Sequence, residues 1–124
     1  MTGVQTCALP IFDTPWPKTR RLCERMQQWL DTEESNGRTD DFSALFTALA
    51  DQQVASDAEL PDTGIGLERE RWLSSAFIRG DSYGTRASTV VAIGHDGRGV
   101  IIERRFGPNG HFDGETVLAI SGRR

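Results

Sequence analysis

The residues best suited to chemistry lie together in the segment SYGTRAST, at positions 82–89. Its polar side chains come directly before an apolar run, and the start of a strand is rigid enough to aim them at a ligand. On a strand, Arg86, Ser88 and Val90 would share one face, because successive side chains alternate. Arg86 could then hold a carboxylate or phosphate through two hydrogen bonds while Ser88 helps to position it. The predicted ligand-binding residues are Tyr83, Thr85, Arg86 and Ser88.

A second interpretation of the same segment stays open. Arg86 could instead be paired with a structural aspartate or glutamate, and an exposed pair of this kind contributes little to stability. Gly84 would then be present only for its backbone freedom.

The histidines and the glycine-rich segment of the chain do not point to a reaction. A catalytic serine, cysteine or threonine needs a base within hydrogen-bond reach, and the only histidines are His95 and His111. Both fall in predicted turns, and two isolated histidines make no metal site. No helix with a GK[ST] start follows the glycines at residues 107–114, so they form no phosphate loop. We therefore predict no metal site and no cofactor, and we assign no catalytic residue.

The strands that must position the polar segment are indicated by alternation and turn signals. Residues 87–93 and 99–106 are β-rich and flank an Asp-Gly pair, which is a strong hairpin signal. Residues 115–120 alternate after the glycine-rich loop and predict a third strand. A short strand is also predicted over residues 76–78.

Two helices are predicted before these strands. Apolar residues recur at spacings of three and four from Lys18 to about Glu33, and Pro17 suits the first helical position. A second, shorter stripe runs to about Asp51, and a mixed-charge helical turn is expected at residues 67–73. Two helices followed by an antiparallel meander predict an α+β fold.

Composition limits the class of protein. The 124 residues suffice for one domain, and 37% hydrophobic with 26% charged residues is ordinary for a globular protein. A net charge of −4 with dispersed arginines argues against nucleic acid as a partner. The apolar runs are far shorter than the roughly 20 residues of a spanning helix. Two cysteines are too few for a small secreted domain that is held together by several disulfide bonds. We therefore expect a cytoplasmic protein without a transmembrane segment.

The first residues of the chain are a special case. The run TGVQTCALPI, at positions 2–11, is similar to the translation of a common short-read sequencing adaptor. A signal peptide is the alternative, but the run has no basic leading region and is interrupted by polar residues and a proline. We expect residues 1–12 to be an artefactual leader without tertiary contacts, and residues 13–124 to form the fold.

Three longer segments carry a family resemblance. They are LPDTGIGLERERWLSSAFIR from Leu60, YGTRASTVV from Tyr83 and HDGRGVIIERRFGP from His95. Together they resemble the carboxy-terminal part of the NRDE-motif proteins, also called the transport and Golgi organisation protein 2 family. The resemblance implies a longer protein, in which residues 13–124 are the carboxy-terminal part of a single domain.

The resemblance also implies a fold and two functions. The family is similar to N-terminal nucleophile hydrolases, with a layered αββα sandwich, a cysteine after the initiator methionine and an Asn-Arg-Asp-Glu motif. Neither feature occurs in this chain. The first hypothesis is an amide hydrolase or acyl transferase that uses this cysteine as nucleophile and its own amine as base. This chain alone would then be inactive, and its partner would be the missing amino-terminal half of its domain. The alternative is a non-catalytic carrier of haem or acyl-lipid.

Overall fold

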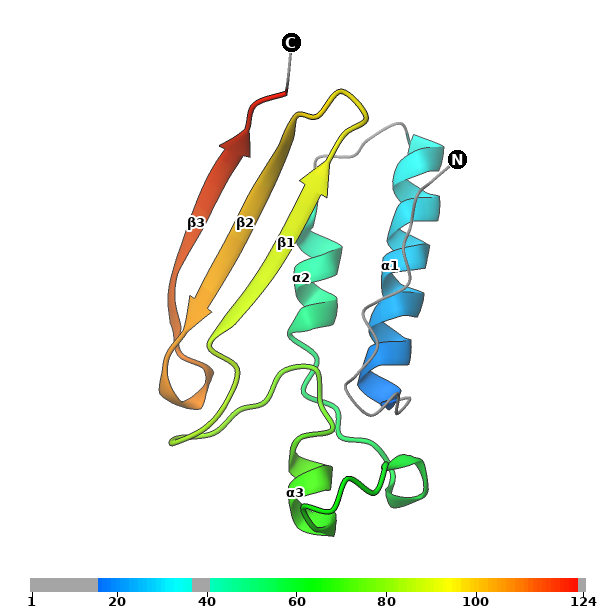
Figure 1. The fold of residues 1–124 in the computed structure, drawn as a ribbon, viewed down its shortest axis with the longest axis vertical. Helices are drawn as coiled ribbons and strands as arrows, with labels where there is room; N and C mark the ends of the chain where they lie inside the picture. Colours follow the sequence, from blue (N-terminus) through cyan, green and yellow to red (C-terminus); the bar gives the residue numbers. More distant parts are fainter. Residues whose placement is uncertain (1–15, 37–40, 123–124) are drawn as a thin grey trace. The chain divides into compact units, whose positions relative to one another are not determined.

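The computed structural model of the chain describes residues 16–36 and 41–122 (Figure 1). The chain divides into two compact units, residues 1–76 and residues 77–124. In the described residues the first unit is helical, and the second is built on a three-stranded sheet. The predicted α+β class is therefore confirmed. The leader predicted at residues 1–12 lies outside the described residues.

The part of the helical unit that the structure describes contains three helices and one short 3-10 turn. The helices are α1 (Pro17–Asn36), α2 (Ser43–Leu49) and α3 (Leu67–Trp72), and the turn spans Asp57–Glu59. Pro17 opens α1 as predicted, where its missing N–H has no intrahelical partner to lose. α2 ends two residues before the predicted Asp51, and α3 forms at the predicted mixed-charge turn.

The core of the helical unit lies where α1 packs on α2. The aromatic ring of Trp29 lies 5.6 Å from that of Phe42, and its Nε1 donates a hydrogen bond to the carbonyl oxygen of Asp41 at 2.8 Å. Met26, from the predicted stripe of α1, remains exposed. The buried residues contributed by α2 and its N-cap are Phe42, Leu45, Phe46 and Ala48.

Two buried polar side chains hold the second half of this unit together. The Glu70 carboxylate accepts hydrogen bonds from the backbone N–H of Thr63 and, at 2.9 Å, from its hydroxyl. The Ser74 hydroxyl donates to the carbonyl oxygen of Arg71 at 2.6 Å and accepts from the N–H of Ala55 at 2.8 Å. These bonds fasten the loop before α3, because buried polar groups are costly when left without partners.

Replacing Glu70 by alanine should lower the free energy of unfolding by about 1 to 2 kcal/mol, because the Thr63 N–H loses its acceptor. Glu68 lies on the same helix and is exposed, so Glu68→Ala should change stability by less than about 0.5 kcal/mol. Urea unfolding of the full chain measures both values. Equal effects of the two substitutions would contradict the role assigned to Glu70.

The second unit is an antiparallel meander. Its strands are β1 (Ala87–Ile93), β2 (Gly99–Phe106) and β3 (Phe112–Ile120), in the order β1-β2-β3 (Figure 1). The predicted first and second strands are confirmed. β3 begins three residues earlier than predicted, because Phe112 pairs with Phe106 across an irregularity in the register. Such pairing interrupts the simple alternation by which strands are recognised.

The hairpin between β1 and β2 turns at Asp96-Gly97, as predicted. Gly97 has a φ of 80°, and its N–H donates to the carbonyl oxygen of Gly94 at 3.0 Å. The Asp96 carboxylate accepts from the backbone N–H of Arg98 at 3.0 Å and from its Nε at 2.8 Å. The hydrogen bond from the Arg98 side chain lowers the pKa of Asp96. Only the glycine accommodates the left-handed backbone without strain.

The short strand predicted over residues 76–78 is wrong. This segment is a bend, and Phe77 is a buried residue whose ring meets that of Phe106 edge-on at 4.9 Å. Ile78 exchanges hydrogen bonds with Thr85 rather than with a strand. The apolar character of residues 76–78 therefore indicates burial of this segment. The backbone of Ile78 finds its hydrogen-bond partner in Thr85 of the following loop.

Candidate functional site

The polar segment that precedes β1 is a closed loop. The N–H of Thr85 donates to the carbonyl oxygen of Ile78 at 2.8 Å, and the N–H of Ile78 donates to the Thr85 hydroxyl at 2.9 Å. We call residues 78–86 the entry loop. A Cβ at Gly84 would lie 2.7 Å from the Ile78 carbonyl oxygen, so only glycine fits there. At the last residue of the entry loop, the carbonyl oxygen of Arg86 accepts from the N–H of Phe106 at 2.8 Å. The backbone of Arg86 is therefore held to β2 at the end of the entry loop.

The four predicted ligand-binding residues occupy different environments. Tyr83 is 57% exposed and Arg86 is also exposed, whereas Ser88 is only 7% exposed. Thr85 uses its hydroxyl to close the entry loop. Along β1 the burial alternates as predicted, with Ser88 and Val90 on the buried side. Arg86, which was predicted to share that side, precedes the strand and is exposed. Tyr83 and Arg86 are therefore exposed to solvent, whereas Ser88 is buried and the Thr85 hydroxyl is used within the loop.

The guanidinium group of Arg86 has no hydrogen-bond or ion-pair partner among residues 16–36 and 41–122. The alternative interpretation of Arg86 requires a carboxylate partner, and none of the described carboxylates forms an ion pair with it. An exposed guanidinium on a fixed backbone offers all five of its N–H donors. A group of this kind can accept a carboxylate or phosphate as its partner.

A second turn supports the entry loop, and the sequence analysis missed it. Arg79 Nε donates to the carbonyl oxygen of Asn109 at 2.7 Å, and the Asn109 N–H donates to the carbonyl oxygen of Gly80 at 2.9 Å. Asn109 and Gly110 have φ values of 57° and 72°. The glycine-rich loop at residues 107–114 therefore contains an ordered 3-10 turn, Pro108–Gly110. The Asn-Gly pair was the available signal, because both residue types tolerate positive φ.

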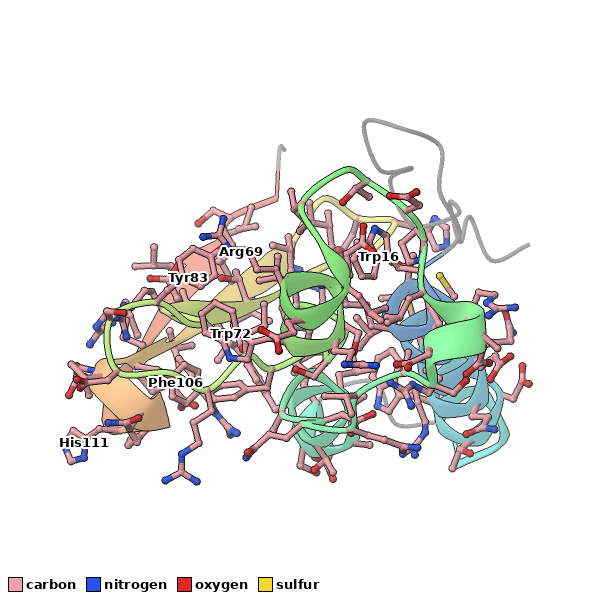
Figure 2. The ribbon with its side chains drawn as sticks, turned by 90° about the horizontal axis from the view of Figure 1, so that it is seen from below. Trp16, Arg69, Trp72, Tyr83, Phe106 and His111 are labelled. Atoms are coloured by element: carbon pink, nitrogen blue, oxygen red, sulfur yellow. The ribbon has the colours of Figure 1, made fainter. Side chains whose placement is uncertain are left out.

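The histidines lie on the surface of the second unit. The His111 ring points away from the ribbon in Figure 2, and its Nε2 lies 3.7 Å from a carboxylate oxygen of Asp113. His95 is also exposed, in the hairpin turn. In the part of the chain that the structure describes, no three His, Cys, Asp or Glu side chains gather as metal ligands. None of the described helices is long and apolar enough to cross a membrane.

Comparison with known proteins assigns the sequence to a family. Residues 3–108, which include the whole entry loop, match the family described as Transport and Golgi organisation 2. The chain belongs to this family. The resemblance found in the sequence is thereby confirmed at the level of the family.

One curated relative is longer than the region that it shares with this chain. The Transport and Golgi organization protein 2 homolog of Bos taurus is 35% identical over 101 residues, covering 76% of this chain and 35% of the relative. The chain therefore spans 35% of the length of the curated relative it matches. No solved structure matches the chain.

Proposed function

We propose that this chain supplies a binding site for an anionic small molecule to a Transport and Golgi organisation 2 protein, with Arg86 as the anion-binding group. The observation that carries the proposal is the exposed Arg86 guanidinium, which has no partner among the described residues. An arginine fork binds a carboxylate or phosphate through two parallel hydrogen bonds. Haem carries propionate groups of this kind, and an acyl-coenzyme A thioester carries phosphates.

The neighbouring residues have distinct parts in this proposal. Tyr83 is an exposed aromatic residue, suited to contact the apolar body of a ligand. Thr85 positions Arg86 by closing the entry loop. Ser88 is buried in β1, the strand that begins directly after Arg86. The ligand classes are haem and acyl compounds, bound by a non-catalytic carrier with a cytoplasmic location.

Amide hydrolysis or acyl transfer of the N-terminal nucleophile type is the second candidate, and one observation favours it. Val91, Ile93 and Leu118 are 56%, 63% and 56% exposed. Val91 and Leu118 both neighbour Ile101 in the sheet register, so these side chains share one face. A second sheet covers such a face in a sandwich. This supports the layered αββα architecture, with the nucleophile outside this chain.

The two candidates differ in whether a covalent acyl-protein forms. A whole-length protein containing this sequence would be incubated with a long-chain acyl-coenzyme A thioester and an acyl amide, and its intact mass would be measured. A mass increase equal to the acyl group, lost on hydrolysis, supports the enzyme. Reversible binding with an unchanged mass supports the carrier.

The Arg86→Lys substitution tests the binding site itself. It keeps the charge and removes the fork, so affinity for haemin or the acyl-coenzyme A should fall about tenfold, since hydrogen bonds to charged groups contribute about 1.5 to 3 kcal/mol. The melting temperature should stay unchanged, because no described side chain pairs with Arg86.

The matched control is Arg98→Lys. Arg98 is an exposed arginine that pairs with Asp96 in the hairpin turn, so this substitution should leave ligand affinity intact. A lower melting temperature of Arg86→Lys with unchanged affinity, or no change in either, would remove Arg86 from the proposed site.

A further inference from the structure

A cavity of about 200 Å³ lies within the helical unit. α1 contributes three cationic residues to its lining: Lys18, Arg21 and Arg25. Their spacings of three and four residues place them on one face of the helix. α2 contributes Thr47, and Asp51, two residues after α2 ends, is the acidic member of the lining. The lining therefore carries three positive charges against one negative charge, an excess of two.

The positive charges of this cavity are incompletely compensated. Arg21 Nε lies 3.8 Å from the nearest Asp51 carboxylate oxygen, which is beyond hydrogen-bond distance. Another Arg21 nitrogen donates to the carbonyl oxygen of Gln53 at 2.9 Å. Lys18 Nζ donates to the carbonyl oxygen of Leu73 at 2.5 Å. Carbonyl oxygens accept hydrogen bonds but carry no net charge, so the excess of positive charge remains.

Two further observations concern cationic groups of the cavity lining. Arg21 Nε is buried and has no hydrogen-bond partner within residues 16–36 and 41–122, a state that is costly for a charged donor. Burial lowers the pKa of Lys18, because its ammonium group is partly removed from water without a carboxylate beside it. A negative charge in the cavity would stabilise both cationic groups through space.

We propose that this cavity binds a phosphate group, held by the guanidinium groups of Arg21 and Arg25 and by the ammonium of Lys18. A phosphate monoester carries about 1.5 to 2 negative charges at neutral pH, which matches the excess of two positive charges better than a single carboxylate does. Arginine forks and a lysine point charge are common phosphate-binding groups.

The size of the cavity limits the ligand. Pockets for drug-sized molecules have volumes of about 300 to 1,000 Å³, and this cavity has about 200 Å³. It accommodates inorganic phosphate or the head of a phosphate monoester, and it is too small for haem or a long acyl chain. The phosphate site is therefore different from the site proposed at Arg86 and can be tested independently.

The experiment is calorimetric titration of the full chain with inorganic phosphate and, separately, with glycerol 3-phosphate. Arg25 is exposed, so Arg25→Gln should leave the fold intact and weaken phosphate binding about tenfold. Arg20→Gln is the control: Arg20 lies on the same helix, pairs weakly with Glu59 at 3.9 Å and does not line the cavity. Asp51→Asn removes the competing carboxylate and should strengthen binding severalfold.

These outcomes decide the proposal. Binding that is weakened by Arg25→Gln, strengthened by Asp51→Asn and unaffected by Arg20→Gln supports the site. Tighter binding of inorganic phosphate or of the monoester then identifies the free or the esterified form as the preferred ligand. Absence of binding by the parent chain, or equal losses in Arg25→Gln and Arg20→Gln, would overturn it.

Discussion

Replacing Phe77 by alanine should destabilise the chain by about 3 to 5 kcal/mol, the range observed when a buried phenylalanine is truncated. Phe77 is 5% exposed, and its ring meets that of Phe106 edge-on at 4.9 Å. A Cβ added at Gly110 would lie only 3.0 Å from the Phe77 ring, so the surrounding backbone is already in close contact. Truncation would leave a cavity that this packing cannot readily fill. Urea unfolding followed by far-ultraviolet circular dichroism measures the loss.

Phe112→Ala is the matched control for Phe77→Ala. Phe112 belongs to the same aromatic cluster, at 6.1 Å from the Phe106 ring, but it is 55% exposed. Its truncation removes less apolar surface from the core, so the expected loss is below about 1.5 kcal/mol. Losses of similar size for the two substitutions would show that Phe77 does not organise the aromatic cluster.

Gly84→Ala should cost roughly 2 to 4 kcal/mol, combining an overpacking cost of about 1 to 3 kcal/mol with the weakening of a hydrogen bond. The new Cβ would lie 2.7 Å from the Ile78 carbonyl oxygen and 3.2 Å from the Gly80 nitrogen, both of which belong to the backbone. The same Ile78 oxygen accepts from the N–H of Thr85. The entry loop must therefore open to admit the methyl group. Thermal and urea unfolding of the full chain measure the cost.

The consequences of Gly84→Ala should extend to Arg86, because the entry loop positions the start of β1. Affinity for haemin or acyl-coenzyme A should therefore fall together with stability. Gly94→Ala is the control, since the nearest atom to its added Cβ belongs to the Asp96 side chain, at 3.0 Å, and the nearest backbone atom is 3.5 Å away. A Gly84→Ala chain as stable as the Gly94→Ala chain would contradict the close contact described here.

Features that depend on neighbours in sequence were predictable from the sequence. Pro17 marked the start of α1, and Asp96-Gly97 marked the hairpin turn. Both signals act through local backbone preferences, which operate before any tertiary contact forms. The alternation of burial along β1 was likewise predicted, because the side-chain period of a strand is fixed by its geometry.

Features that depend on distant partners were not predictable in the same way. The segment at residues 76–78 has the composition of a strand, yet Ile78 bonds with the entry loop and Phe77 packs on Phe106. The early start of β3 depends on the pairing of Phe112 with Phe106 across the sheet. Pairing of this kind is decided by which backbone groups meet in space, and intrinsic strand preference does not determine it.

The candidate sites also combine features that the sequence predicts with features that only the structure shows. The sequence by itself determined the polar segment at the start of β1 and the family to which the chain belongs. Only the tertiary structure separated exposed Arg86 from buried Ser88, and only it gathered Lys18, Arg21 and Asp51 around one cavity. The physical reason is that residue type sets which hydrogen bonds and charges are possible, whereas burial and partner distance set which of them remain available to a ligand.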